Sequence, residues 1–153
     1  MYLKTISYVD FNGEPREEDC YFNLSPAEVY LMSKSKNGGI YEILKKMVKE
    51  KDEAGLTQYI KDLLLAAYGV KSNDGRNFRK NSAIREDFES TPAFSELYML
   101  LVCDTDEATK FVNNVLPSEE AMNKYIKMME NSMKKQAEQK TEGVPQIAAK
   151  SVE

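Results

Sequence analysis

Two strand-like runs at the start of the chain predict a β-hairpin. Residues 2–9 are rich in β-branched and aromatic types, and residues 16–24 offer a return strand. Asn12-Gly13 lies between them and favours a type I′ turn, because both central residues of that turn need a positive φ. Since a two-stranded hairpin is only marginally stable in water, we expect it to pack on the rest of the chain or to pair with another chain.

After the hairpin, the apolar positions recur at helical spacing. Ser25-Pro26-Ala27-Glu28 predicts a helix start, with a capping serine, a proline at the first helical position and a glutamate that closes a capping box. This helix carries Ala27, Tyr30 and Leu31 on one face, and we expect it to end before Gly38-Gly39.

Four later segments share the spacing i, i+3, i+4, i+7, i+8, which is typical of amphipathic helices that bury one face. Their apolar stripes are Ile40-Ile43-Leu44-Met47-Val48, Leu56-Tyr59-Ile60-Leu63-Leu64, Phe94-Leu97-Tyr98-Leu101-Val102 and Ala108-Phe111-Val112-Val115-Leu116. Asp104 is the expected cap of the last one.

The stretch between the second and third stripes is polar. We expect Gly69 to end the second helix, residues 71–76 to form a turn, and residues 82–88 to form a short helix.

The composition changes after Pro117. Residues 118–140 predict one further helix, and from Thr141 onward the residues are typical of a flexible terminus. One face of that helix carries Met122, Tyr125, Ile126, Met129 and Met133. Flexible, polarizable methionine side chains suit surfaces that accept varied apolar partners, so this face either binds a partner or folds back onto the domain.

The patterns together predict an α+β fold that is mostly α. An N-terminal hairpin (2–24) is followed by a bundle of about five to six amphipathic helices (26–116). These form a compact domain over residues 1–117, and residues 118–153 form a helical appendage with a flexible tail.

Composition narrows the function. The chain has 153 residues, 42% of them hydrophobic, and a net charge of −4, which fits one domain and disfavours non-specific nucleic-acid binding. The apolar runs are too short to span a membrane, and the first residues lack the apolar core of a signal peptide. We therefore expect a cytoplasmic protein that binds neither membrane nor nucleic acid.

The residues that usually carry chemistry are missing or unpaired. The chain has no histidine, and the spacings of zinc sites and phosphate loops are absent. Asn73-Asp74-Gly75 lacks the glutamate that an EF-hand needs at its twelfth position, so a tight turn is expected there. We predict no catalytic residue, metal or cofactor.

Two further groups of residues have plain interpretations. The most basic stretch is more typical of a solvated loop than of a phosphate-binding patch; its residues are Lys71, Arg76, Arg79, Lys80 and Arg85. Cys20 and Cys103 are expected to be reduced and buried rather than paired.

The order of motifs resembles the tail assembly chaperones of long-tailed bacteriophages of Gram-positive hosts, over residues 2–117. The resemblance rests on an ordered set of segments. The first are Lys4-Thr5-Ile6-Ser7-Tyr8-Val9-Asp10-Phe11-Asn12-Gly13, Tyr21-Phe22-Asn23-Leu24-Ser25-Pro26-Ala27-Glu28 and Gly38-Gly39. They are followed by Leu64-Leu65-Ala66-Ala67-Tyr68-Gly69-Val70-Lys71-Ser72, Asp74-Gly75-Arg76-Asn77-Phe78, Phe88-Glu89-Ser90-Thr91-Pro92-Ala93-Phe94-Ser95-Glu96-Leu97 and Phe111-Val112-Asn113-Asn114-Val115-Leu116-Pro117.

The resemblance implies a protein that is not an enzyme. Members coat the long, largely helical tape measure protein, keep it soluble until the tail tube polymerises, and are absent from the finished virion. It implies the tape measure protein as a partner, contact with the tube protein, and residence in the host cytoplasm. The alternative is a structural virion component, such as a head–tail connector or minor tail protein.

Two surfaces are the candidate interaction sites. The apolar face of residues 118–140 is the candidate partner-binding site. The edge of the first strand is a candidate for self-association, because unpaired backbone groups there can accept a strand from another copy. The residues assigned to this edge are Tyr2, Lys4, Ile6 and Tyr8.

Overall fold

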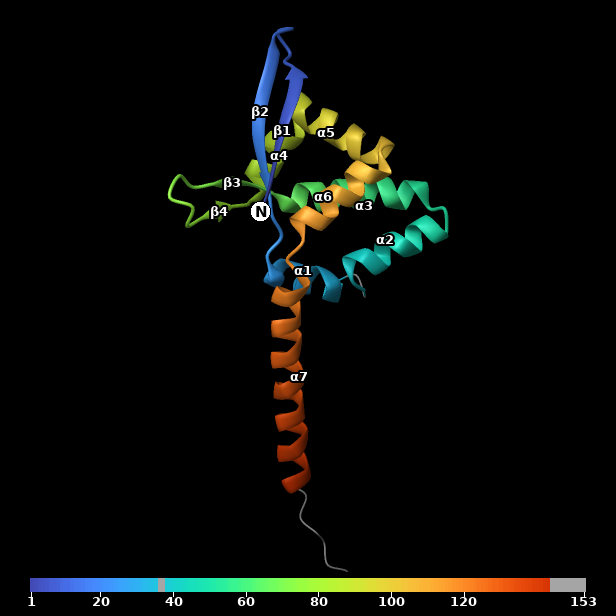
Figure 1. Cartoon of the computed structure of the whole chain (residues 1–153), viewed down its shortest axis with the longest axis vertical. Coiled ribbons are helices and arrows are strands. Elements are labelled where there is room, and N and C mark those ends of the chain that lie inside the picture. Colours follow the sequence, from blue (N-terminus) through green and yellow to red (C-terminus); the bar gives the residue numbers. More distant parts are fainter. Residues whose placement is uncertain (36–37, 144–153) are drawn as a thin grey trace, which may run out of the picture. The chain divides into compact units, whose positions relative to one another are not determined.

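The computed structural model describes residues 1–35 and 38–143, which form four strands and seven helices (Figure 1). The chain divides into two compact units, residues 1–117 and 118–153. The strands are β1 (Tyr2–Val9), β2 (Pro15–Phe22), β3 (Tyr68–Lys71) and β4 (Phe78–Arg79). The helices are α1 (Pro26–Ser35), α2 (Ile40–Lys49), α3 (Glu53–Ala67), α4 (Ser82–Glu89), α5 (Pro92–Cys103), α6 (Thr105–Val115) and α7 (Glu119–Glu142).

The predicted fold class is confirmed: the protein is α+β and mostly helical, with an N-terminal hairpin ahead of the helices. The sheet is larger than a hairpin, however, because β3 pairs with β2 and β4 pairs with β3. All neighbouring strands are antiparallel, in the order β1-β2-β3-β4.

The hairpin turn differs from the predicted type I′ turn. Gly13 has a φ of 83°, whereas Asn12 is not among the residues with a positive φ. The Gly13 N–H donates to the Asp10 carbonyl at 2.9 Å, as in a three-residue loop whose last position is a left-handed glycine. The Asp10 carboxylate holds this loop by accepting hydrogen bonds from the backbone N–H groups of Asn12 and Glu14.

The return strand ends at Phe22, two residues earlier than predicted. Phe22 pairs with Tyr2, the first residue of β1, so the ladder has no partner for the next residues. Asn23 donates its N–H to the Ala67 carbonyl instead, and Leu24 donates to the Val115 carbonyl. This segment therefore ties the sheet to the C-terminal ends of α3 and α6.

Gly69 was predicted to end α3, but it lies within β3. The last residue of α3 is Ala67, and Tyr68 already has an extended backbone. A Cβ on Gly69 would lie 2.7 Å from Cε1 of Phe78, so only glycine lets β3 approach β4 this closely. The polar turn is found at Gly75, whose N–H donates to Ser72 and whose φ is 73°.

The predicted helix starts are confirmed. Ser25 accepts from the Glu28 N–H at 3.2 Å while the Glu28 carboxylate accepts from the Ser25 N–H at 2.8 Å, which is a complete capping box. Asp104 caps α6. On the apolar face of α1, Tyr30 and Leu31 are exposed.

Aromatic rings fill the core where the sheet meets α4, α5 and α6. Phe22 is fully buried, and its ring lies 5.3 Å from that of Phe111 and 6.0 Å from that of Phe88. Phe88 stacks on Tyr68 with ring centroids 3.8 Å apart. Strands and helices far apart in sequence therefore meet around one side chain.

The two cysteines lie in different environments. Cys20 is buried as predicted, and burial raises the pKa of its thiol to about 12. Cys103 is exposed at the end of α5, contrary to the prediction, because it follows the buried stripe of that helix.

In the second unit, α7 extends two residues beyond the predicted helix and includes Thr141. The remainder of the predicted flexible terminus, residues 144–153, lies outside the described residues. None of the helices in the described part of the chain combines the length and apolar character needed to cross a bilayer.

Candidate functional site

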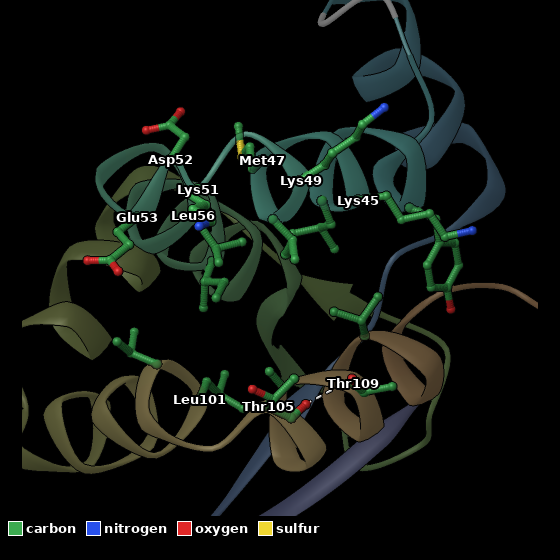
Figure 2. A pocket seen from close by; sticks show the side chains of 17 residues that line it. Lys45, Met47, Lys49, Lys51, Asp52, Glu53, Leu56, Leu101, Thr105 and Thr109 are labelled. Carbon is green, nitrogen blue, oxygen red and sulfur yellow. Dashed lines mark hydrogen bonds between the residues drawn. The ribbon is translucent and has the colours of Figure 1, made fainter.

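An apolar groove of about 670 Å³ opens in the first unit between α2 and α3 on one side and α5 and α6 on the other. Figure 2 shows α2 and α6 as its opposite walls, with side chains from both pointing into the space between them. The sequence stripes predicted the helices that form it but not the groove.

The groove is apolar because four stripes converge on it without closing. Leu101 and Val112 at its base belong to the buried core. Met47 and Leu56 line its walls and are half-buried, while Val48 is 62% exposed. Within the ten residues of α2, Ile40 alone is fully buried, so most of its apolar stripe faces this opening.

Local structure fixes α2 and α3 side by side. Lys51 adopts a left-handed conformation with φ 55°, which reverses the chain sharply between the two helices. Asp52 then caps α3 by accepting from the Gly55 N–H at 2.9 Å. At the far end, the Tyr41 hydroxyl of α2 hydrogen-bonds to the Asn113 side chain of α6. The Tyr41–Asn113 bond therefore joins the two walls at one end of the groove.

The rim carries charge unevenly. Lys45, Lys49 and Lys51 stand along the α2 side, and the acidic residues Asp52 and Glu53 lie where α3 begins. The facing wall of α6 contributes Thr105, Ala108 and Thr109, none of which is charged. The Thr109 hydroxyl already donates to the carbonyl of Thr105 at 2.8 Å, so it is not a free donor for a ligand.

The chemistry of the groove suits binding rather than catalysis. Its base holds aliphatic side chains, and its polar groups stand at the rim. Among the described residues, no cluster of three or more histidine, cysteine or acidic side chains is placed to hold a metal ion. Such a surface gains free energy by covering apolar area.

The predicted partner-binding residues lie together on one face of α7, in the second unit. Tyr125, Ile126 and Met133 are exposed, and Met122 and Met129 are half-buried. Successive members are one to four residues apart, so the five side chains line one side of the helix over about three turns. Their role as a binding site stays a prediction.

The residues assigned to the self-association edge turn their side chains toward the protein. Tyr2 packs edge-to-face on Phe111, and Ile6 is 5% exposed. Lys4 forms an ion pair of 3.0 Å with Glu107 of α6. Any pairing at this edge must therefore use the backbone of β1 rather than these side chains.

The basic stretch does not form one patch. The loop interpretation expected Lys80 to be solvated. Its side chain is instead 9% exposed and forms an ion pair of 2.7 Å with Glu28. Lys71 lies over the ring of Tyr21, with Nζ 5.5 Å from its centroid. Arg76 and Arg79 are exposed.

Comparison with known proteins assigns the family. A family model described as phage tail assembly chaperone matches residues 1–152. The chain belongs to this family of phage tail assembly chaperones. Its role is therefore that of a chaperone in tail assembly, which implies function without catalysis. No curated protein and no solved structure matches the chain.

Proposed function

We propose that this chaperone binds the tape measure protein and keeps it soluble until the tail tube polymerises. The observation that carries the proposal is the open apolar groove between α2–α3 and α5–α6. A long helical client exposes apolar stripes before the tube encloses it, and such stripes aggregate unless covered. A groove walled by helices is a surface on which the apolar face of another helix can lie.

Release requires that each contact be weak. The groove is short, because Tyr41 and Asn113 join its walls at one end and α2 has ten residues. One copy therefore covers a small part of the client. Many copies along one client give high overall occupancy through avidity, and arriving tube subunits can displace them one at a time.

We also propose that copies associate with one another through the outer edge of β1. Asp10 donates its N–H to Glu14, so the hydrogen-bonded pairs of the β1–β2 ladder fall on even-numbered residues of β1. Leu3, Thr5, Ser7 and Val9 consequently direct their backbone groups outward.

This edge is self-complementary. Two antiparallel copies of β1 can place Leu3 opposite Val9 and Thr5 opposite Ser7, with no like charges facing each other. Replacing Ser7 with proline removes an outward N–H and should lower the mass measured by light scattering, whereas Ser7→Ala should not. Equal masses for both variants would exclude this edge.

The proposed site of action is the host cytoplasm, and the protein should be absent from the virion. Mass spectrometry of purified particles separates this role from that of a connector or minor tail protein. Peptides of this chain at stoichiometric amounts in the particle would favour the structural role.

The client assignment is tested by co-expression with the tape measure protein of the same phage. The wild-type chain should raise the soluble fraction of the client and co-purify with it. Val48→Glu should abolish both effects, because it places a charge on an exposed groove residue without touching the buried core. Leu31→Glu, an exposed α1 position that is not part of the groove lining, is the matched control. An insoluble client with wild-type chaperone would refute the proposal.

A further inference from the structure

The α2 lip of the groove is basic and the α6 wall is neutral, while the two acidic lining residues, Asp52 and Glu53, lie where α3 begins. Lys45 and Lys49 are four residues apart on α2, so they project one above the other along the same lip. The α6 wall presents threonine and alanine instead. The two borders of whatever lies in the groove therefore meet different surroundings.

The lysines on this lip have no acidic partner within residues 1–35 and 38–143. The lysines that form salt bridges elsewhere in that part of the chain are Lys4, Lys61, Lys80 and Lys110. Of the two acidic lining residues, Asp52 caps α3 through its Oδ1 and Glu53 begins that helix, and neither forms an ion pair with Lys45 or Lys49. The ammonium groups of Lys45 and Lys49 are thus exposed charges available to a ligand.

The walls also indicate which backbone conformation a bound peptide adopts. The walls are helices, two of which are joined by a short loop at Lys51 and Asp52, so the groove has no strand edge along which an extended peptide could form a β-ladder. A peptide lying there as a strand would leave its own backbone groups unpaired over apolar side chains. A helix satisfies its backbone internally. A polar small molecule would need convergent polar groups at the base, where Leu101 and Val112 lie.

We propose that the groove selects an amphipathic helix whose apolar stripe is bordered on one side by carboxylates one helical turn apart. This rests on the proposed function and specifies which helices of the client are bound. Lys45 and Lys49 are separated by a rise of about 6 Å. Acidic residues at i and i+4 of a nearly parallel or antiparallel helix have the same rise, so both pairs can form together.

The direct test uses two synthetic peptide helices of 21 residues that bind the full-length chain. Both carry leucine at i, i+3, i+4 and i+7. The first peptide has glutamate along one border of the stripe and lysine on the far face. The second peptide has lysine at the border and glutamate on the far face. The two peptides therefore have the same composition and net charge. Fluorescence anisotropy of the labelled peptides gives their affinities. The glutamate-bordered peptide should bind about tenfold more tightly, and the difference should shrink as salt rises.

Variants of the chaperone locate the effect. Lys45→Glu and Lys49→Glu together should abolish or reverse the preference between the two peptides. Lys46→Glu is the control, because Lys46 is exposed on the same helix but is not part of the groove lining. Circular dichroism should be unchanged in all variants, since the three positions are exposed.

Several outcomes would overturn the proposal. Equal binding of both peptides, binding of neither, or a preference that survives the Lys45 and Lys49 exchange would each do so. Equal binding of a glutamate-bordered peptide interrupted by two prolines would show that a helix is not required. If the peptides are not distinguished but the tape measure protein stays soluble on co-expression, the selectivity is wrong and the client assignment stands. If they are distinguished but the client precipitates, the client assignment fails.

Discussion

Lys80 joins three separate segments of the first unit, and its removal should destabilise the fold. Its ammonium group donates to the Asn23 carbonyl and to the Glu28 carboxylate, the latter at 2.7 Å. Lys80→Met keeps an unbranched side chain that is one heavy atom shorter and removes the charge. Glu28 would lose its partner and the Asn23 carbonyl would lose its donor.

The size of the loss follows from burial. Removing one partner of a fully buried ion pair costs about 3–5 kcal/mol, whereas exposed pairs contribute roughly 0.2–1 kcal/mol. The Lys80 side chain is 9% exposed and that of Glu28 is 36% exposed, so this pair lies between the two cases. With the orphaned Asn23 carbonyl included, we expect a loss of about 2–3 kcal/mol, or about 10 °C in Tm.

Urea unfolding of the wild type, Lys80→Met, Glu28→Gln and the double variant gives the free energies of unfolding and the coupling between the two residues. The coupling should be about 1 kcal/mol or more. Burial disfavours ionisation of Glu28, but hydrogen bonds from Lys80 and Ser25 outweigh it, so the pKa of Glu28 is lowered. Its contribution is therefore present above the unfolded carboxyl pKa of about 4.3 and lost as pH falls through the folded value.

The cost of Lys80→Met should accordingly shrink in acid. A loss below about 0.5 kcal/mol at pH 7, the range of ordinary surface substitutions, would refute the reasoning. So would additive effects of Lys80→Met and Glu28→Gln, because the two side chains would then act independently.

Three further outcomes are expected. Gly69→Ala should lower the free energy of unfolding by about 1–3 kcal/mol, since the new Cβ would overlap the Phe78 ring; an unchanged urea midpoint would contradict this packing. A thiol reagent should label Cys103 rapidly and Cys20 only after unfolding, and two fast thiols would contradict the burial. A fragment of residues 1–117 should unfold cooperatively with the urea midpoint of the full chain, and a noncooperative transition would show that the remainder is needed.

The helices could be predicted from sequence because their signals are local. The stripes that begin at Ile40, Leu56, Phe94 and Ala108 lie within four observed helices. The capping box at Ser25 and the cap at Asp104 depend on residues two or three positions away, and they formed as predicted. When local preferences agree with the overall fold, the helices can be predicted from the sequence in this way.

The extra strands could not be predicted, because their stability is not local. β3 has four residues and follows α3 directly, and β4 has two. They exist as strands because Tyr21 and Phe22 present a free edge to Tyr68 and Gly69. Taken alone, residues 68–79 carry only the polar turn signal around Gly75.

The groove could not be predicted from the sequence, for a related reason. A stripe shows that a helix has an apolar side, but it does not show what covers that side. Val48 and Leu56 look like core positions, yet the spacing between α2 and α6 leaves them at an opening. One feature of the sequence does point to the groove. α2 carries five apolar stripe residues in ten positions, which is more than so short a helix buries here.

The hydrogen bond from the Leu24 N–H to the Val115 carbonyl joins the start of the first unit to its end. During synthesis on the ribosome the hairpin leaves the exit first, and it must wait until α6 has followed before this closure can form. An interval therefore exists in which Phe22 has neither Phe88 nor Phe111 beside it. Nascent chains translated in neighbouring positions on one message would be most prone to mispair at their strand edges during that interval.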